Sequence, residues 1–328
     1  MPVQITIIGL GQIGASMGLA LADHKDTILR VGHDKNLDVE RAAFQKGAAD
    51  KMEHNLPKAV RDAKVVVLCL PLSQMRETLE FIAPDLQEGA VVLDTTPIKA
   101  GVQKWAQEIL PDGCYFVGLV PAINPEFLHD FHHAPSAPQP DLFSKGIFLV
   151  DAPRGTPEEA VILAMNFVRL LGAEALLADS LEADGLMSTT HLLPQLVAAS
   201  LLNATIDQPG WLDARKMAGR AYATVTAGLA DHDEIDSLRL SALHNQAGVV
   251  HALDVTIAAL RGLRDDIENG DEDGVALRLE SALKGRKRWL NERMSADWTK
   301  STQTELPDLP SLTERLFGGL FLRKSRKK

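Results

Sequence analysis

The chain has 328 residues, of which 45% are hydrophobic, so it can bury a substantial core and by length divides into about two domains. Its 34 lysines and arginines stand against 44 aspartates and glutamates, and the formal charge of -10 repels nucleic-acid backbones. The composition therefore disfavours a nucleic-acid-binding protein and favours a small-molecule partner.

Cysteine usage and hydropathy indicate a protein of a reducing compartment. Cys69 and Cys114 lie in apolar stretches typical of strands, and we expect buried free thiols. No apolar run reaches the roughly 18 residues of a membrane span, and the chain enters a strand at once, without a charged and apolar leader. We therefore expect a cytoplasmic protein without a membrane span.

The first predicted strand, over 3–8, leads into a glycine pattern and then an apolar helix over 15–22. The glycines of segment 9–14 match G-x-G-x-x-G, in which the first permits a tight turn, the second lets a pyrophosphate approach the backbone, and the third lets helix and strand pack closely. The helix N-terminus offers free N–H groups to phosphates, so we predict a dinucleotide site. The predicted cofactor-binding residues of this segment are Gly9, Leu10, Gly11, Gln12, Ile13 and Gly14.

The second predicted strand, over 27–34, ends in an acidic residue. Asp34 lies 20 residues beyond Gly14, where a carboxylate can accept hydrogen bonds from both hydroxyls of the adenosine ribose. The same carboxylate would repel a 2′-phosphate, so NAD is the predicted cofactor. The adjacent Lys35 keeps NADP open as the alternative, because a cation there could accommodate the extra phosphate.

Further apolar runs alternate with helical segments as far as residue 178. Continuous runs of this kind, separated by amphipathic helices, indicate parallel strands that are covered on both faces. The predicted fold class is α/β, with a doubly wound parallel sheet of the Rossmann type in a dinucleotide-binding domain over 1–180. The remaining predicted strands lie over 64–70, 89–94, 114–120, 146–151 and 173–178.

Two loops follow the carboxyl ends of predicted parallel strands, where open sheets bind their ligands. The loop "CLPLSQ" spans residues 69–74, and the loop "DTTPIKAGV" spans residues 94–102. We expect both to border the nicotinamide and the substrate, with Leu70, Pro71 and Thr95 in contact with the cofactor.

Strand signals stop after residue 180. Leucines and valines recur near helical spacing over 181–300, interrupted at "DQPGW" and "NGDEDG", which predicts an all-α C-terminal domain for substrate binding and dimerisation. The remainder, 301–328, is polar and proline-punctuated before a basic run, and we expect a flexible basic tail.

Several segments keep the order and spacing of one known family. They are the glycine segment, "VGHD", "VVLCLPLSQ", "VVLDTTPIK", "YFVGLVP", "DLFSKGIFLV" and "LLGAEALLADSLEADGLMSTTHLLPQ". From about residue 3 to about residue 265 the chain resembles the prephenate and arogenate dehydrogenases of tyrosine biosynthesis. The resemblance implies an NAD- or NADP-dependent oxidoreductase that oxidises a hydroxylated cyclohexadiene as carbon dioxide leaves, and a homodimer formed through the helical domain.

Four positions depart from the family's catalytic pattern. Pro97 stands where the family has a serine, and Val120 stands where it has the catalytic histidine of a Gly-x-His-Pro turn. The family's Ser-His-Leu-Pro-His segment aligns with His191 to Gln195, where one histidine is displaced by one position. The family's substrate-binding arginine aligns with Val225. Valine cannot accept the hydroxyl proton, and loss of a general base typically costs about 10²- to 10⁴-fold in rate. The family fold therefore carries altered substrate chemistry.

Two residues are predicted to replace the general base. His191 lies on a helix that should face the cleft, and Lys99 follows the loop at the mouth of the site, where burial could lower the pKa of its ammonium group. The predicted substrate-binding residues are Ser188 and Gln195 on the side of His191, Arg220 about one turn before Val225, and Asn124 at the start of the next loop.

That loop, over 124–141, is rich in proline and histidine. His129, Asp130, His132 and His133 do not have zinc-type spacing, so we predict no metal site. A long loop near the cleft could instead close over the substrate as a lid.

Three hypotheses of function follow. The first is a dehydrogenase of the prephenate dehydrogenase family that takes hydride from prephenate, arogenate or a related hydroxylated carboxylate. The second is a β-hydroxyacid dehydrogenase or imine reductase that uses Lys99. The third is a nucleotide-binding sensor without turnover, which the four lost groups would explain.

Overall fold

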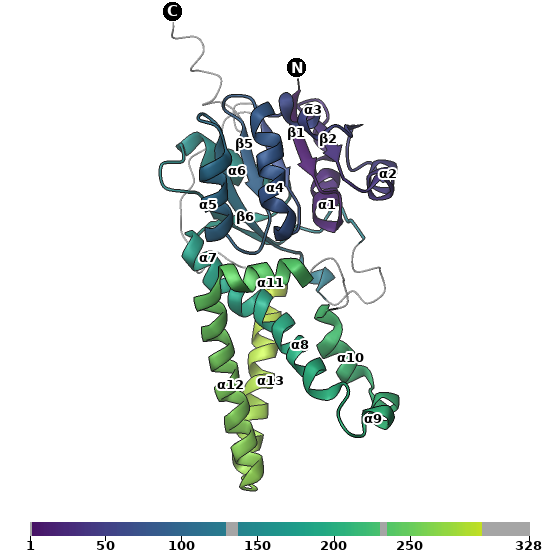
Figure 1. The fold of residues 1–328 in the computed structure, drawn as a ribbon, viewed down its shortest axis with the longest axis vertical. Helices are drawn as coiled ribbons and strands as arrows, with labels where there is room; N and C mark the ends of the chain where they lie inside the picture. Colours follow the sequence, from purple (N-terminus) through teal and green to yellow (C-terminus); the bar gives the residue numbers. More distant parts are fainter. Residues whose placement is uncertain (1, 129–136, 230–234, 297–328) are drawn as a thin grey trace, which may run out of the picture.

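The computed structural model describes residues 2–128, 137–229 and 235–296. An eight-stranded sheet with the order β3-β2-β1-β4-β5-β6-β7-β8 forms the N-terminal part of the molecule (Figure 1). The predicted doubly wound α/β sheet is confirmed. The strands are β1 Val3–Ile8, β2 Ile28–His33, β3 Lys51–Met52, β4 Val65–Leu68, β5 Val91–Asp94, β6 Tyr115–Ala122, β7 Ile147–Asp151 and β8 Glu174–Leu177.

Two features of the sheet differ from the prediction. The two-residue strand β3 pairs with β2 and was not predicted, because it is too short to show a pattern. Strand β7 runs antiparallel to β6, whereas every other neighbouring pair in the described sheet is parallel. A parallel connection needs a crossover element, and the described residues between β6 and β7 contain only the short 3₁₀ turn Pro125–Phe127 as helix.

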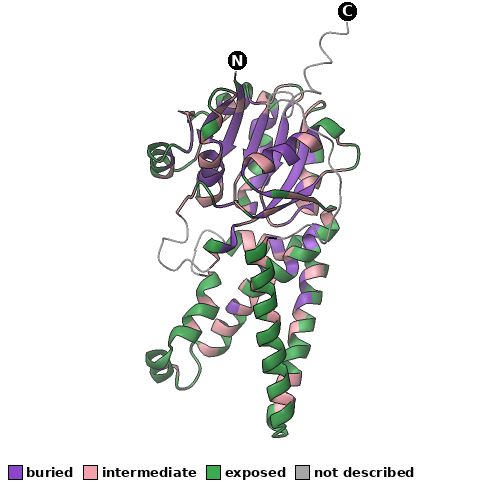
Figure 2. Ribbon diagram, turned by 180° about the vertical axis from the view of Figure 1, so that it is seen from behind, coloured by how far each residue is buried: buried purple, intermediate pink, exposed green. Residues whose placement is uncertain are grey.

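Helices cover both faces of the sheet. They are α1 Gln12–Ala20, α2 Leu37–Gln45, α3 Leu56–Arg61, α4 Leu72–Ile82, α5 Ala100–Ile109 and α6 Glu158–Leu170. Along β4 and β5 the side chains alternate between two hydrophobic clusters: Val65, Val67, Val91 and Leu93 pack on the side of α1 and α6, and Val66, Leu68 and Val92 pack on the side of α4 and α5. Burial on both faces explains the continuous apolar runs of the sequence (Figure 2).

The predicted all-α C-terminal region is confirmed and begins at Ser180. Its elements are α7 Ser180–Met187, a π-helical turn Ser188–Leu192, α8 Leu193–Thr205, α9 Trp211–Met217, α10 Arg220–Thr226, α11 Ile235–His244, α12 Gln246–Glu268 and α13 Glu272–Ser295. The long helices α12 and α13 run side by side away from the sheet (Figure 1). Leu192 and Val249 join the hydrophobic cluster of α4 and α5, so the π-helical turn and the start of α12 pack against the sheet domain.

Further expectations concerned membrane spans, the two cysteines and two polar segments. No described helix combines the length and the apolarity that crossing a membrane would need. Cys69 and Cys114 are free, as expected, but half-buried rather than buried. The histidines of 129–133 and the basic segment 301–328 lie outside the described residues.

Candidate active site

A cavity of about 490 Å³ lies between the carboxyl edge of the sheet and the helical region. Its wall combines the glycine turn before α1, the loops after β4 and β5, the end of β6, the π-helical turn, α8 and α11. The lining residues are Gly11, Gln12, Ile13, Gly14, Cys69, Leu70, Pro71, Leu72, Thr95, Thr96, Pro97, Val120, Pro121, Met187, His191, Leu192, Gln195, Ser237, Leu238 and Ser241.

The three glycines of the turn have different surroundings. A Cβ atom at Gly9, which has φ +88°, would lie 2.2 Å from the carbonyl oxygen of Cys69, and a Cβ at Gly14 would lie 1.9 Å from that of Gly9. A Cβ at Gly11 would meet no protein atom within 4 Å. The fold therefore requires the first and third glycines, whereas the second borders open space at the start of α1, where no side chain caps the helix. That space and the helix N-terminus fit a pyrophosphate.

Asp34 holds the glycine turn against the end of β2. Its Oδ2 accepts a hydrogen bond from the Leu10 amide at 2.7 Å, and its Oδ1 accepts one from the Asn36 amide at 2.8 Å. Among the predicted cofactor-binding residues, Gly9, Leu10 and Asp34 do not line the cavity itself. Gly11, Gln12, Ile13, Gly14, Leu70, Pro71 and Thr95 do line it.

His191 and Gln195 are the two predicted substrate-side residues that reach the cavity. His191 lies in the π-helical turn, and the surrounding protein, which displaces part of the water around the imidazole, lowers the pKa of His191. A neutral imidazole at neutral pH can accept a proton. Gln195 lies one turn further on, and its Nε2 donates to the carbonyl oxygen of His191 at 3.0 Å.

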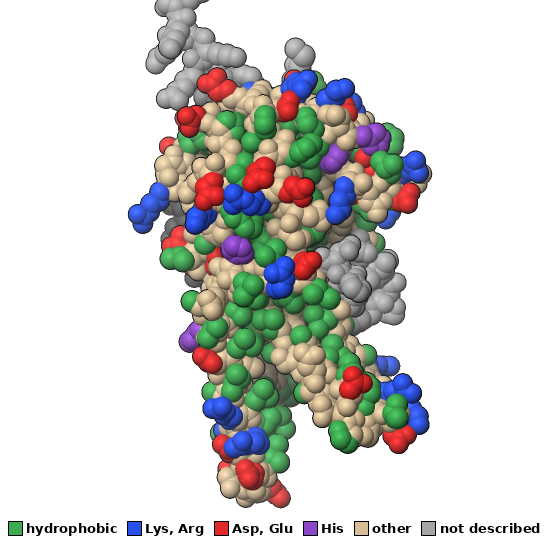
Figure 3. All heavy atoms as spheres, in the orientation of Figure 1, with side chains coloured by type: hydrophobic (Ala, Val, Ile, Leu, Met, Phe, Trp, Pro, Cys, Tyr) green, Lys and Arg blue, Asp and Glu red, His purple; other side chains and the backbone are tan. Residues whose placement is uncertain are grey.

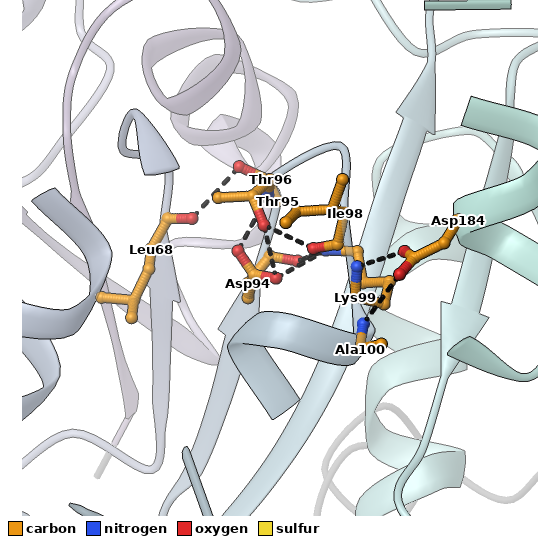
Figure 4. A network of polar contacts seen from close by, with 8 residues as sticks. All are labelled: Leu68, Asp94, Thr95, Thr96, Ile98, Lys99, Ala100 and Asp184. Atoms are coloured by element: carbon orange, nitrogen blue, oxygen red, sulfur yellow. Dashed lines mark hydrogen bonds and ion pairs between the residues drawn. The ribbon is translucent and has the colours of Figure 1, made fainter. Parts of the chain in front are cut away.

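Lys99 does not line the cavity, so its position does not support the predicted role as a base. Its side chain is completely buried, and Nζ forms an ion pair with Asp94 Oδ2 at 2.6 Å (Figure 4). Thr96 donates to the same carboxylate, with its amide 2.8 Å from Oδ1 and its hydroxyl 2.9 Å from Oδ2. The ammonium is therefore committed to Asp94, which fixes the loop that carries Thr95 and Thr96.

The same buried network extends to the helical region. Asp184 of α7 accepts hydrogen bonds from the amides of Lys99 and Ala100 at 2.5 and 3.2 Å and so caps the start of α5 (Figure 4). Burial raises the pKa of the Asp184 carboxyl, an effect that those amide hydrogen bonds oppose. Asp184 thus ties the sheet domain to the helices behind the cavity.

Asp151 is the third carboxylate of this buried region. It ends β7, and its Oδ2 is the one buried side-chain oxygen or nitrogen of the described residues without a hydrogen-bond partner. Burial, opposed by the nearby Lys99 ammonium and reinforced by the charge of Asp184, raises the pKa of Asp151 to about 6.

Three predicted substrate-binding residues lie away from the cavity wall. Ser188 is buried, and its Oγ donates to the Asp184 carbonyl at 2.9 Å and accepts from Asn245 Nδ2 at 2.7 Å. Asn124 is also buried and caps the turn after β6, where its Oδ1 accepts from the Glu126 amide at 3.1 Å. Arg220 begins α10 and is exposed. Intramolecular bonds occupy the first two, and the third faces solvent, so the structure gives none of them a place in the cavity wall.

The sequence did not predict the contribution of α11. Ser237, Leu238 and Ser241 line the cavity, and Ser237 Oγ lies 3.2 Å from Ser73 Oγ of α4, across the boundary between sheet domain and helices. The two cavity serines stand four residues apart, on one face of the helix. That spacing was the available signal, but nothing local shows which face of a helix meets a cleft.

Cys69 is no nucleophile in this cavity. Burial raises the pKa of its thiol to about 12, so the sulfur stays protonated at neutral pH. No group of three or more metal-ligating side chains occurs among the described residues. The chemistry available to the described wall is therefore hydrogen bonding and proton acceptance by His191.

Comparison with known proteins identifies the sheet domain. Residues 17–177 match the family model described as prephenate dehydrogenase, nucleotide-binding domain. The chain is 24% identical over 284 residues to the cyclohexadienyl dehydrogenase of Zymomonas mobilis, covering 86% of this chain and 94% of that protein. It is 23% identical over 273 residues to the prephenate dehydrogenase of Bacillus subtilis, covering 83% and 72% respectively.

Solved structures share the fold. The prephenate dehydrogenase of A. aeolicus, in complex with hydroxyphenyl propionate and NAD⁺, superposes with a TM-score of 0.75 at 19% identity and covers 88% of this chain and 98% of its own. The arogenate dehydrogenase of Synechocystis gives a TM-score of 0.67 at 20% identity and covers 88% and 100%. Both likenesses extend over the sheet and into the helical region.

Proposed function

Because the chain belongs to the prephenate dehydrogenase family, we propose that it is an NAD-dependent oxidoreductase that takes hydride from a hydroxylated carboxylate. One observation carries the proposal: the open glycine turn and His191 line the same cavity. A cofactor site and a proton acceptor thus face one cavity.

The residues of the cleft fit the cofactor. The amides that begin α1 at Gln12 and Ile13 would hold the pyrophosphate, and Asp34, which already fixes the turn, would accept the ribose hydroxyls and favour NAD over NADP. Leu70, Pro71 and Thr95 would border the nicotinamide. When bound, the nicotinamide supplies the hydride acceptor.

His191 performs the protein's part of the reaction. As a carbon–hydrogen bond of the substrate gives up hydride, the neutral imidazole accepts the hydroxyl proton, and the carbon–oxygen bond becomes a carbonyl or phenol. In this role His191 replaces the family's histidine at position 120, and the side chain of Val120 contributes only apolar surface. The Gln195 amide holds the backbone of the π-helical turn that carries His191.

The other hypotheses have less support. A lysine-based β-hydroxyacid dehydrogenase or imine reductase needs a free amine in the cleft, and Lys99 is buried in an ion pair. A sensor without turnover needs no proton acceptor, yet His191 stands in the wall.

Assembly and location are also proposals. Exposed apolar side chains gather on α12 and α13, and Figure 3 shows hydrophobic atoms on the lower helices. Burial of this surface against a second copy would form a homodimer through the helical region. The two free cysteines fit the reducing cytoplasm.

An activity screen tests the proposed function. Purified protein is incubated with NAD⁺ and a panel of hydroxylated carboxylates, including prephenate and arogenate, and NADH formation is followed for the wild type and for His191→Asn. We expect at least one compound to reduce NAD⁺, and we expect His191→Asn to bind NADH normally while it turns over about 10²-fold or more slowly. Equal turnover by the two proteins would contradict the role of His191.

A further inference from the structure

The cavity wall carries no fixed charge among the residues that the structure describes. Its lining contains no lysine, arginine, aspartate or glutamate, and His191 is its one titratable nitrogen base. Beyond the glycine turn, the wall is apolar at Pro97, Val120, Met187, Leu192 and Leu238. Such a wall offers a carboxylate no ionic partner.

The lysine and arginine predicted to lie at the site do not reach the cavity. The Lys99 ammonium is paired with Asp94 and completely buried, and Arg220 is exposed on α10, outside the wall. The two internal stretches that the structure leaves out, 129–136 and 230–234, contain no lysine or arginine in their sequence. Their ionisable side chains are histidines and acidic residues.

The neutral donors of the wall are few. The Gln195 amide already donates to the backbone of His191, and Ser237 lies against Ser73 at 3.2 Å. The hydroxyls of Thr95 and Thr96 donate to other protein oxygens. The Ser241 hydroxyl and the amides that begin α1 are the main donors left to a ligand. Such donors can hold one carboxylate that keeps some solvent. Withdrawing a second carboxylate from water without a cation is strongly unfavourable, because its desolvation is not compensated. The charge of the wall therefore selects against a dicarboxylate.

We propose that the substrate is a hydroxylated ring compound with a single carboxylate, and not the dicarboxylate prephenate. This inference rests on the proposed function. The ring lies on the apolar surface of Val120, Met187 and Leu238, with its hydroxyl toward His191. Oxidation is then complete with one hydride passed to NAD⁺ and one proton passed to His191, and the carbon–oxygen single bond becomes a double bond. No carboxylate has to leave.

A binding comparison tests this proposal without requiring turnover. The complex of the protein with NADH is titrated with trans-4-hydroxycyclohexanecarboxylate, a monocarboxylate, and with prephenate, while the NADH fluorescence is recorded. We expect the monocarboxylate to bind the wild type at least about tenfold more tightly. Prephenate bound equally well or better would overturn the proposal, and a cation from a second copy or from the basic segment would then be its partner.

Two matched variants test the physical reason. Gln195→Arg places a cation in the wall, and Gln195→Met keeps the length of the side chain without a charge. We expect only Gln195→Arg to tighten prephenate binding, by about tenfold or more. An unchanged prephenate affinity in Gln195→Arg would show that the lack of a cation in the wall is not what excludes prephenate. Failure of NADH itself to bind would instead count against the proposed function, so the two failures are distinguishable.

Discussion

At the scale of single residues, His191 shows how a small change in a helix moves a functional group. In the family pattern Ser-His-Leu-Pro-His, one residue separates the first histidine from the proline. In this chain two residues separate His191 from Pro194, so the histidine lies one position earlier. The structure has a π-helical turn over Ser188–Leu192, and a π-helical turn accommodates one extra residue within a helix. His191 lies in this turn and lines the cavity. The sequence alone gives the residue but not this local geometry.

The pH dependence of turnover follows from the environment of His191. Partial loss of water lowers the pKa of His191 from its usual 6.5, and only the neutral imidazole accepts a proton. We expect the rate of hydride transfer to fall as the pH decreases and His191 becomes protonated, with the midpoint of the fall below pH 6.5. Single-turnover rates between pH 5 and pH 8 measure this, and a fall centred above pH 7 would contradict the assignment.

Asp151 makes a prediction about stability. Its pKa is about 6 in the folded protein against 3.8 as the ordinary value, so between these values the folded state binds more protons than the unfolded state. The contribution of Asp151 to stability therefore decreases as pH rises from about 4 to about 6, by up to roughly 3 kcal/mol, and stays low above that window. Asp151→Asn should be more stable than the wild type at pH 8 and nearly equal at pH 4.

Chemical denaturation at the two pH values checks this prediction, with Asp112→Asn, an exposed aspartate, as the control. A stability gain of Asp151→Asn that is the same at both pH values would show that shape rather than charge is responsible.

At the scale of elements, the sequence predicts what depends on local pattern. The apolar runs predicted seven of the eight strands, because most of these strands are buried on both faces. The edge strand β8 is partly exposed, but it is still an apolar run of strand length. The direction of β7 could not be predicted, since strand direction depends on the path of the connection and not on the strand's own residues. For the same reason α11 was predicted as helix but not as a wall of the cavity, because its placement depends on packing against α4.

The turn between β1 and α1 gives a prediction at this scale. Gly14→Ala would place a methyl group 1.9 Å from the Gly9 carbonyl oxygen in the unrelaxed structure, so helix and turn must separate. We expect a loss of unfolding free energy of about 2 kcal/mol or more, by analogy with other overpacked sites. Gly185→Ala in α7, where a Cβ meets no atom within 4 Å, is the matched control and should be neutral or slightly stabilising. Equal stability of the two variants would contradict the close packing.

At the scale of the whole molecule, the sequence predicted the division into a sheet domain and a helical region. It did not predict how the two parts pack against each other. Cofactor residues were predicted because the glycine pattern is local, whereas Ser188, Arg220 and Asn124 were assigned to substrate from position along the chain alone. Lys99 was assigned from its loop, and only the buried pairing with Asp94 shows that it supports the site from behind.

The proposed homodimer gives a prediction about the assembly. Leu260, Leu277 and Leu283 on α12 and α13 are more than half exposed. We expect the wild type to sediment as a dimer at micromolar concentration and Leu277→Glu to shift toward the monomer. Phe81 is an exposed apolar residue of α4, and Phe81→Glu should leave the sedimenting mass of the dimer unchanged. A monomeric wild type would refute the dimer.

The most direct test of the account is NADH binding by Gly11→Val. The backbone of Gly11, with φ -65° and ψ -164°, suits any residue, and the space beside it is empty of protein atoms, so the variant should fold with the thermal stability of the wild type. The valine side chain would occupy the place of the pyrophosphate. We predict that the wild type binds NADH and that Gly11→Val loses at least about 10²-fold in affinity. A wild type without affinity for NADH, or a folded Gly11→Val that binds it as tightly, would contradict the account.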